Sequence, residues 1–501
     1  MKAPTNSSRT TAAVADRVIV LANRAPFRHE HSRGGIVASR SASGLVTALE
    51  PLLEASSGTW VAHAAGSADS AVVDRLGGID VPPANPQYRV RYVPLSDDVF
   101  RGYYCGFANE GLWPLCHRVD VTPVFRRADY EMYRAANTRF GAVVADEAGD
   151  GAPIVLVQDY HFALAPRMLR ERMPHARVVA FWHIPWPRCR TFVTCPWAVE
   201  LVDGLLGSDI TGFQTDDDCQ NFLGCVDALL PDAVVDVQQG TIKYQGRITT
   251  VRAYPVGVDC EHEALRSAPP IAACREWAGE RLGLPRDTRL GVGVDRMDYT
   301  KGITEKFLAI ERLLEQQPGL IGKFAFVQIA EPSRDCLAAY RHARDQAFET
   351  CRRINARFGG SPIRFIEEHH EPDAVYRYYR AADFCYVASL RDGMNLVAKE
   401  FVAARDDDRG VLVLSEFAGA AQQLRAALLV NPLKHEQAAN AMAQALGMSS
   451  IEQGKRMRVL RADVAAFDGS WWATQMLHDA IHGIAACDRS AEELRWSAAV
   501  A

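Results

Sequence analysis

Short apolar runs alternate with segments of helical periodicity along most of the chain. Glycine or polar residues flank each run, a pattern typical of buried strands in parallel sheets. The predicted strands span residues 17–22, 154–158, 178–183, 210–213, 289–295, 324–329, 384–388 and 411–415. Because strands that alternate with helices build doubly wound sheets, we predict an α/β fold.

The length of 501 residues exceeds one ordinary hydrophobic core and predicts two domains with a cleft between them. A hairpin predicted over 241–251 precedes the domain boundary, which we place at residue 256. The expected order is a disordered tail (1–16), an N-terminal domain (17–256), a C-terminal domain (257–470) and a final helix within 471–490 that crosses back to the N-terminal domain.

Charge and hydropathy exclude several classes of partner. The net charge is −5 and the basic residues are dispersed, which argues against nucleic acid and against a membrane surface. No stretch approaches the ~20 apolar residues of a membrane span, and the polar N-terminus lacks a signal-peptide core. The 12 cysteines form no C-x-x-C pair, so we expect buried thiols at Cys105, Cys116, Cys225 and Cys385 and a cytoplasmic location.

The segment 389–400 carries the strongest candidate chemistry. It follows a predicted strand, turns at Gly393 and starts a helix at Asn395. The unpaired amides and partial positive charge of a helix N-terminus bind phosphate, and the carboxylates of Asp392 and Glu400 can accept from sugar hydroxyls. The segment therefore suits a sugar nucleotide, although strand–glycine–helix turns also occur without a ligand.

A second strand ends in two cations, Arg296 and Lys301. The planar guanidinium and the mobile ammonium suit a diphosphate that gains charge as its bond to a sugar breaks. The alternative is a solvated basic loop in which Asp295 and Asp298 neutralise the two cations.

Two strands of the N-terminal half end in polar residues. Asp159 follows the strand at 154–158, and His183 ends the next strand. Since ligands bind beyond the carboxyl ends of strands in open sheets, Asp159 is a candidate contact for an acceptor hydroxyl and His183 for a sugar oxygen. For His183 the alternative is a core histidine with satisfied hydrogen bonds.

The segment 102–114 is rich in glycine and aromatic residues and has neither helical nor strand periodicity. We therefore predict a loop. Tyr104 and Trp113 in it are candidates to stack on a pyranose, although aromatics of this density are equally typical of packed core.

These motifs occur together in a known family. The chain resembles the trehalose-6-phosphate synthase family, retaining glucosyltransferases with the GT-B fold, in which two Rossmann-like domains face a cleft. The resemblance rests on Asn23-Arg24, Ser43 to Leu45, Leu112 to Pro114, Asp159 to His161, His183 to Pro185, Asp295 to Gly302, Pro332 to Arg334, and Arg391 to Glu400. It implies transfer of glucose from UDP-glucose to glucose 6-phosphate, giving trehalose 6-phosphate and UDP, with no cofactor and no metal.

The resemblance also implies a role for each matching residue. The implied catalytic residues are Asp159, His183, Arg296, Lys301 and Asp392. The implied donor contacts are Gly44, His183, Arg296, Lys301, Asp392, Gly393, Met394, Asn395, Leu396, Val397 and Glu400. The implied acceptor contacts are Arg24, Tyr104, Trp113, Asp159 and Arg334. The implied mechanism has no covalent enzyme intermediate, because the acceptor attacks on the face from which UDP departs.

The chain departs from the family pattern at several positions. His63 stands where a second tryptophan is usual, Ser43 precedes Gly44 where a glycine is usual, and Gln214 replaces a histidine. The segment 29–40 before the glycine is longer and more basic than expected. His63 leaves open another phosphorylated acceptor, such as glycerol 3-phosphate. A catalytically silent sugar-phosphate sensor is a third hypothesis, and the choice among UDP, GDP and ADP and a homo-oligomeric state also stay open.

Two acidic clusters resemble metal sites. We interpret Asp216 to Asp218 as the first turn of a helix, where acidic residues are stabilising, rather than as metal ligands. The His369-His370 pair among glutamates is interpreted as a solvated loop before a helix at Asp373.

Overall fold

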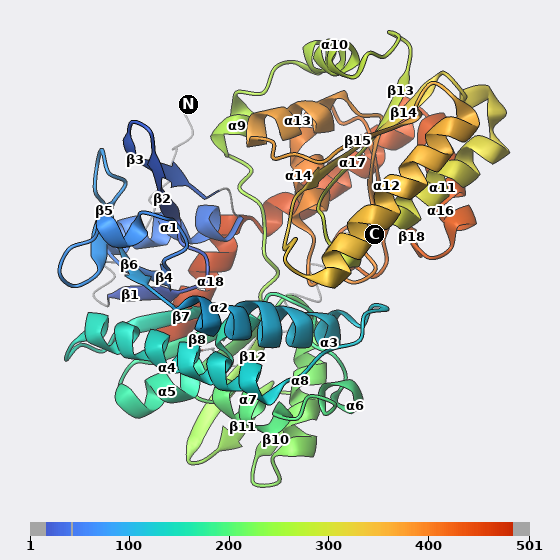
Figure 1. Cartoon of the computed structure of the whole chain (residues 1–501). Coiled ribbons are helices and arrows are strands. Elements are labelled where there is room, and N and C mark those ends of the chain that lie inside the picture. The colour runs from blue at the N-terminus through green and yellow to red at the C-terminus, as the bar shows by residue number, and fades with distance from the viewer. Residues whose placement is uncertain (1–16, 42–43, 484–501) are drawn as a thin grey trace, which may run out of the picture.

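The computed structural model describes residues 17–41 and 44–483. The predicted tail 1–16, Ser43 and the end of the predicted C-terminal segment lie outside the described residues. Two separate sheets, each with helices packed on it, form the two halves of the molecule; an extended segment connects them, and the chain returns to the first half at its last described helix (Figure 1). The described helices include none long and apolar enough to cross a membrane.

The N-terminal half is built on a ten-stranded sheet. Its central strands are parallel, and antiparallel strands close both edges. In spatial order the strands are β10 (Val234–Asp236), β11 (Thr241–Tyr244), β12 (Arg247–Ala253), β9 (Ile210–Phe213), β8 (Arg177–Phe181), β7 (Ile154–Gln158), β1 (Val18–Leu21), β4 (Thr59–His63), β6 (Tyr88–Val93) and β5 (Gly78–Val81). The helices of this half include α1 (Gly44–Ser56), α2 (Asp97–Phe100), α3 (Trp113–His117), α4 (Arg127–Ala148), α5 (Ala165–Arg172), α6 (Cys189–Phe192), α7 (Ala198–Leu205) and α8 (Asp216–Leu229).

The C-terminal half is built on a six-stranded sheet that is parallel throughout. In spatial order the strands are β15 (Ile363–Ile366), β14 (Phe324–Glu331), β13 (Arg289–Arg296), β16 (Phe384–Val387), β17 (Val411–Ser415) and β18 (Leu428–Val430). The helices are α9 (Glu263–Arg266), α10 (Ile271–Leu282), α11 (Ile303–Gln316), α12 (Ala338–Phe358), α13 (Pro372–Ala381), α14 (Leu396–Ala404), α15 (Ala420–Gln423), α16 (His435–Gly447) and α17 (Ser450–Ala466).

All eight strands predicted from the sequence are present, and so is the predicted hairpin, as β11 and β12. One end was wrong, because β8 stops at Phe181 and leaves His183 in the following loop. The hydrophobic pattern missed β4, β5, β6, β10, β15 and β18; β4 has polar residues at both ends, and two arginines interrupt the apolar residues of β6. It also missed a two-stranded hairpin, β2 (Phe27–Ser32) and β3 (Gly35–Arg40), in the segment expected to be a long basic loop.

The prediction of a loop over 102–114 was wrong. Residues Arg101–Leu112 form a π-helix that continues directly into α3. Its glycines permit close packing, since a Cβ on Gly106 would clash with the Asp129 carboxylate of α4. Glycine at such positions breaks the helical hydrophobic pattern in the sequence, while tertiary packing supplies the stability that the pattern does not show.

The last described helix, α18 (Gly469–His482), packs on α1 and β8 of the N-terminal half, as expected of a segment that crosses back (Figure 1). It begins two residues before the predicted start, and Asp468 caps it by accepting from the Trp471 amide. A hydrogen bond also fixes the connecting segment, because the buried Lys399 Nζ of α14 donates to the Val256 carbonyl at 2.7 Å.

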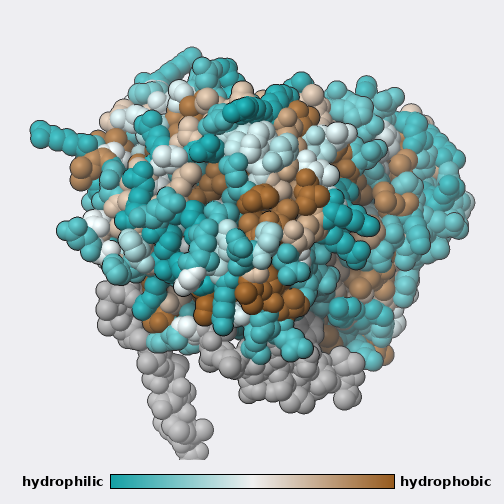
Figure 2. Space-filling view, turned by 90° about the horizontal axis from the view of Figure 1, so that it is seen from below, coloured by the Kyte–Doolittle hydropathy of each residue, from teal (hydrophilic) through white to brown (hydrophobic). Residues whose placement is uncertain are grey.

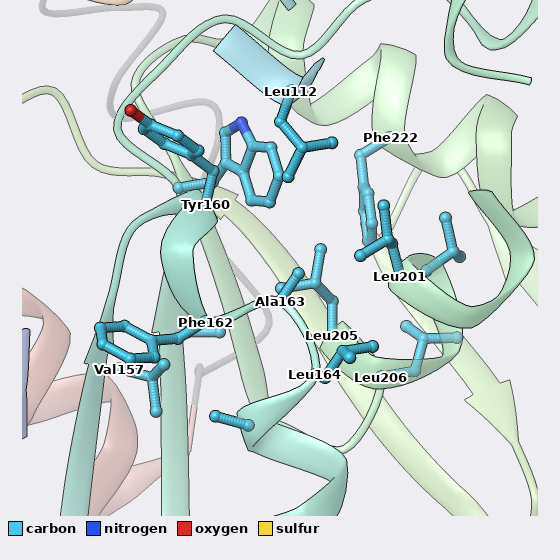
Figure 3. Packing of buried hydrophobic residues seen from close by; sticks show 14 of the residues in the cluster. Leu112, Val157, Tyr160, Phe162, Ala163, Leu164, Leu201, Leu205, Leu206 and Phe222 are labelled. Carbon is cyan, nitrogen blue, oxygen red and sulfur yellow. The ribbon is translucent and has the colours of Figure 1, made fainter. Parts of the chain in front are cut away.

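The largest apolar cluster lies in the N-terminal half and packs aromatic rings against leucines from several helices. Figure 3 shows Tyr160 at the edge of this cluster, with its hydroxyl directed away from the leucine side chains. The outer surface seen in Figure 2 is mostly hydrophilic, with only small apolar patches. Cys116, Cys225 and Cys385 are buried as predicted, whereas the prediction for Cys105 was wrong, since it is only half-buried.

Candidate active site

The predicted strand, turn and helix over 389–400 are present as β16, a turn and α14. Asn395 caps α14 by accepting from the Ala398 amide at 3.0 Å. Its side-chain amide donates to Asp392 at 3.1 Å. The cap satisfies one of the backbone N–H groups that have no partner within the helix. The N–H groups of Leu396 and Val397, also in the first turn, stay available to a ligand. We call residues 389–397 together with Lys301 the amide turn.

Lys301 and Asp392 form the charged centre of the amide turn. The Lys301 Nζ lies 2.5 Å from the Asp392 carboxylate, and both side chains are largely buried. Burial acts to raise the pKa of Asp392, but the Lys301 ammonium and the Asn395 amide outweigh it and lower the pKa. The ammonium is therefore neutralised within this half of the molecule.

Glu400 lies one helical turn into α14 and accepts from the Tyr379 hydroxyl at 3.1 Å. Burial raises the pKa of its carboxyl group, and the tyrosine hydrogen bond offsets part of that effect. The side chain keeps partial exposure and a second oxygen for a hydroxyl group of a ligand.

Two glycines bring the halves of the molecule into contact at the amide turn. A Cβ on Gly393 would overlap the carbonyl oxygen of His183, which belongs to the N-terminal half. A Cβ on Gly44, the first residue of α1, would lie 2.8 Å from Leu396 Cδ1. The start of α14 therefore faces the start of α1. A side chain at Gly393 would require the opposite backbone to move, whereas one at Gly44 would require only the Leu396 side chain to shift.

Two guanidinium groups lie over one indole, and a third is their electrostatic neighbour. Arg334 lies 4.3 Å from the Trp113 ring centroid and Arg296 lies 5.5 Å from it. Arg24 is exposed, yet burial of its guanidinium among protein atoms and then the charges of Arg296 and Arg334 lower its pKa. We call Arg24, Arg296 and Arg334 the arginine cluster. It draws one residue from the N-terminal half and two from the C-terminal half.

The arginine cluster is held by Asp298, which the sequence suggested only as a neutralising partner in a solvated loop, and by two tyrosines to which it assigned no role. Asp298 has no exposed side-chain surface and lies 3.8 Å from Arg296 and 3.7 Å from Arg334. Burial raises its pKa, but the charges of the arginines and Lys301 prevail and lower it. Arg334 also donates to Tyr340 at 2.5 Å and to Tyr160 at 3.2 Å. Asp298 was indicated by its place beside the two cations, whereas Tyr160 was indicated only by its place within a quoted family motif.

Trp113 and Tyr104 have different environments. Trp113 is 5% exposed, and its indole N–H has no hydrogen-bond partner within the described chain. Its ring is therefore a packed support for the two arginines rather than an open sugar platform. Tyr104 is only half-buried. Burial raises the pKa of its hydroxyl, but Arg334, Arg24 and Arg296 outweigh burial and lower it.

Tyr104 belongs to a stack of four nearly parallel rings. His63, Phe100, Tyr104 and His161 stack in that order, with centroid separations of 4.7, 5.0 and 5.5 Å. His63 accordingly does not occupy a place beside the arginine cluster, because the Phe100 ring separates it from Tyr104.

Asp159 has a backbone φ of 75°, a left-handed conformation that is costly for a residue other than glycine. One carboxylate oxygen accepts from the Tyr160 amide at 2.9 Å and from the His183 amide at 3.2 Å. The other oxygen lies 3.8 Å from His161. Burial raises the pKa of Asp159 to about 6, so the carboxyl group titrates near neutral pH.

The His183 ring lies between two glutamines. Its Nε2 is 2.9 Å from Gln158 Oε1 and its Nδ1 is 3.5 Å from Gln214 Nε2. Burial lowers the pKa of His183 to about 3, so the ring is neutral. Gln214 also accepts from the Val256 amide at 3.0 Å. The glutamine that replaces the family histidine thus connects His183 to the segment between the two sheets.

The acidic clusters have structural roles. Thr215 caps α8, and Asp218 accepts from the Trp186 amide at 2.8 Å, which confirms the helix-start interpretation. The 369–370 histidines precede α13, as expected. Among the described residues, no group of three His, Cys, Asp or Glu side chains is placed to hold a metal ion.

The charges of the site suit two anions. The amide turn offers backbone donors and Lys301 to one, and the arginine cluster offers planar guanidinium forks to another. Asp298 is the carboxylate that contacts both Arg296 and Arg334, and Lys301 also acts on its pKa, so the two regions are electrostatic neighbours.

Comparison with known proteins identifies the family. The family described as Glycosyltransferase family 20 matches residues 16–482. The trehalose-6-phosphate synthase of Mycobacterium avium (strain 104) is 39% identical over 485 residues, covering 94% of this chain and 96% of that protein. The Mycobacterium tuberculosis (strain CDC 1551 / Oshkosh) trehalose-6-phosphate synthase is 38% identical and covers 93% and 94%.

Solved structures agree. The structure described as "Trehalose-6-phosphate from E. coli bound with UDP-2-fluoro glucose" has a TM-score of 0.83 at 30% identity, covering 93% of this chain and 99% of that chain. The UDP-forming α,α-trehalose-phosphate synthase from Burkholderia xenovorans in complex with glucose-6-phosphate has a TM-score of 0.78 at 32% identity, with the same coverage. These similarities confirm the predicted GT-B fold with two Rossmann-like domains. The chain therefore belongs to glycosyltransferase family 20 and is an enzyme of the trehalose-phosphate synthase class.

Proposed function

We propose that the enzyme transfers glucose from UDP-glucose to glucose 6-phosphate and releases UDP and trehalose 6-phosphate. The observation that carries the proposal is the proximity of the amide turn and the arginine cluster, two anion sites that share Asp298 as a neighbour. Relatives whose structures hold a UDP-sugar analogue or glucose 6-phosphate support the same pair of substrates.

In the proposed donor complex the C-terminal domain (257–470) binds the nucleotide sugar. The diphosphate binds to Arg296, Lys301 and the amides of Leu396 and Val397. Glu400 accepts from the ribose, and Gly44 and the turn residues Gly393, Met394 and Asn395 let the diphosphate approach the backbone closely. Asp392 contacts the glucose ring. The Nε2 atom of His183 is already hydrogen-bonded to Gln158. His183 therefore contacts the glucose ring only if a sugar hydroxyl replaces Gln214 as the partner of Nδ1.

In the proposed acceptor complex the N-terminal domain (17–256) supplies Arg24, Tyr104 and Asp159, and Arg334 reaches across from the C-terminal domain. The acceptor phosphate is a dianion, which matches guanidinium groups arriving from both domains. Trp113 supports the arginines from behind. The 12 cysteines without a C-x-x-C pair fit the reducing cytoplasm as the proposed location.

The proposed reaction proceeds with retention. The acceptor hydroxyl attacks the anomeric carbon on the face from which the bond to the diphosphate oxygen breaks, and the leaving phosphate takes the hydroxyl proton. Lys301, Arg296 and the α14 amides stabilise the charge that develops on UDP. Asp159 orients the acceptor hydroxyl.

The test is a matrix of UDP-, GDP- and ADP-glucose against glucose 6-phosphate, glycerol 3-phosphate and free glucose, with nucleotide release and product mass followed. The proposal predicts trehalose 6-phosphate from UDP-glucose and glucose 6-phosphate as the fastest pair. A faster reaction with glycerol 3-phosphate would replace the proposed acceptor. No product from any pair, with well-folded protein that still binds glucose 6-phosphate, would favour a sensor.

A further inference from the structure

Two thiols from opposite halves of the molecule meet beside the site. Cys105 is in the π-helix of the N-terminal half, and Cys336 is in the segment between β14 and α12 of the C-terminal half. Their Sγ atoms are 3.7 Å apart although 231 positions separate them in the sequence. A disulfide requires about 2.05 Å, so a small approach of the two segments is enough to form the bond.

Both thiols are next to residues of the proposed acceptor site. Cys105 follows Tyr104, and Cys336 is two positions after Arg334. Arg334 has a left-handed φ of 51° and donates across the domains to Tyr160. The segment that carries Cys336 therefore holds the guanidinium that bridges the two domains.

The two thiols differ in access. Cys336 is exposed and Cys105 is half-buried, while most other described cysteines are buried. Burial and the neighbouring Cys336 raise the pKa of Cys105 to about 12, so its thiolate is scarce. The exposed Cys336 is the sulfur that an oxidant reaches first, and Cys105 is the nearby thiol that can resolve the product.

We propose that Cys105 and Cys336 form a reversible disulfide when the enzyme meets a hydroperoxide, and that this bond fixes the two domains beside the acceptor site. The Cys336 thiolate attacks the peroxide O–O bond and becomes a sulfenic acid, with the second oxygen released as hydroxide that takes up a proton to form water. The Cys105 thiol then displaces the sulfenic oxygen as water and closes the S–S bond. The two thiols lose two electrons and two protons, and the peroxide is reduced; a dithiol reverses the reaction.

The bond changes access to the proposed acceptor site. It joins the segment after Arg334 to the π-helix that carries Tyr104, so these two acceptor-site segments can no longer move apart. Transient disulfides of this kind are the ones found in reducing compartments. This effect on turnover rests on the proposed function, whereas the bond itself does not. We expect oxidation to lower turnover about tenfold, the scale of a gating step.

The experiment treats the full chain with hydrogen peroxide, blocks free thiols by alkylation and maps tryptic peptides by mass spectrometry. Trypsin leaves Cys105 in peptide 102–118 and Cys336 in peptide 335–341. The expected product is these two peptides joined, with the loss of two hydrogens and reversal by dithiothreitol. Because peptide 102–118 also contains the buried Cys116, the Cys105→Ser variant identifies which of its sulfurs reacts.

Activity with UDP-glucose and glucose 6-phosphate is followed in parallel. The Cys336→Ser variant should keep the turnover of the reduced enzyme and resist peroxide, whereas Cys260→Ser, which removes a half-buried thiol elsewhere, should respond like the parent. Oxidation of Cys336 to higher acids without a linked peptide, or no reaction at either thiol, would overturn the disulfide. A linked peptide with unchanged turnover would overturn the gating effect alone. If the reduced enzyme forms no trehalose 6-phosphate, the proposed function fails while the peptide map still decides the disulfide.

Discussion

The amide turn and the arginine cluster both concentrate positive charge, but they balance it differently. In the amide turn, Lys301 has its own carboxylate partner at 2.5 Å within the same domain. In the arginine cluster, Arg296 and Arg334 share Asp298 at 3.7–3.8 Å, and Arg24 joins them from the other domain. The first region is complete inside one domain, whereas the second exists only when both domains are in place. Removing a cation should therefore destabilise the folded protein in the amide turn, where the cation is paired, but not in the arginine cluster, where the cations repel one another.

The strongest test removes the paired cation. Lys301→Ala should lower turnover by about 10²–10³-fold, because the Lys301 ammonium no longer stabilises the charge on the leaving diphosphate. It should also lower the unfolding free energy by about 3–5 kcal/mol, since Asp392 becomes a buried charge without its partner. Steady-state kinetics and chemical denaturation measure the two effects. Turnover loss with unchanged stability would show that the Lys301–Asp392 pair is not structural.

For the arginines that share Asp298 we expect the same effect on turnover and the opposite effect on stability. Arg296→Ala should lower turnover by about 10²–10³-fold, yet its melting temperature should stay the same or rise, because one of three mutually repelling guanidinium groups is removed. Arg312→Ala is the matched control, since Arg312 is exposed and its hydrogen-bond partner is Glu315 on the same helix. Near-normal turnover in folded Arg296→Ala would rule out its assigned role.

A variant of Arg334 distinguishes binding of the acceptor from binding of the donor. Arg334→Ala should raise the KM for glucose 6-phosphate by about 10–100-fold, the size of a lost hydrogen bond to a charged group, and leave the KM for UDP-glucose within about twofold. Arg334→Lys should recover only part of the loss, because an ammonium cannot reproduce the fork that reaches Tyr160 and Tyr340. Arg341→Ala, whose side chain donates to the Asp335 carbonyl, is the control in the same segment. Equal changes in both KM values would place Arg334 outside the acceptor site.

The same contrast explains what the sequence could predict. Apart from Lys301, the amide turn lies in one contiguous segment between a strand and a helix, so its residues share a local pattern, and the structure keeps that pattern between β16 and α14. The arginine cluster is assembled from three distant segments, and only the family resemblance indicated it. Asp298 was named only as a partner in a solvated loop, because its burial is not visible in the sequence, and the π-helix beside the cluster was missed because it has no recognisable period. Packing between domains is a tertiary property that periodicity does not encode.

A smaller effect concerns the pH dependence of the region between the two anion sites. The folded pKa of Asp159 is raised to about 6 from an ordinary value of 3.8. Its ionised form is disfavoured in the folded protein, so stability is lost as pH rises from about 4 to 6 and stays lost above pH 6. Asp159→Asn, which can keep both backbone hydrogen bonds through its carbonyl, should therefore be more stable than the parent at pH 7.5 by about 1–3 kcal/mol.

The stability advantage of Asp159→Asn should shrink below pH 6. The variant should lose activity at every pH, because Asp159 keeps a strained backbone conformation that serves function rather than stability. Denaturation midpoints between pH 4.5 and 8 measure the stability difference. A difference that does not change with pH would show that the carboxyl group ionises normally in the folded protein.

The smallest effect is expected at His63, the departure that first left the acceptor open. Its ring contacts Phe100 and the Val93 carbonyl, and Phe100 separates it from Tyr104. It can act on the acceptor only by supporting the ring stack, and one aromatic contact contributes about 0.5–1.5 kcal/mol. His63→Leu should therefore raise the KM for glucose 6-phosphate about two- to tenfold without changing the preference over glycerol 3-phosphate. Tyr104→Leu should have a larger effect on the same KM, because Tyr104 is the ring beside the arginines. A change of preferred acceptor in His63→Leu would mean that specificity is set by the far end of the stack, and the arginine cluster would then recognise the phosphate but not the sugar.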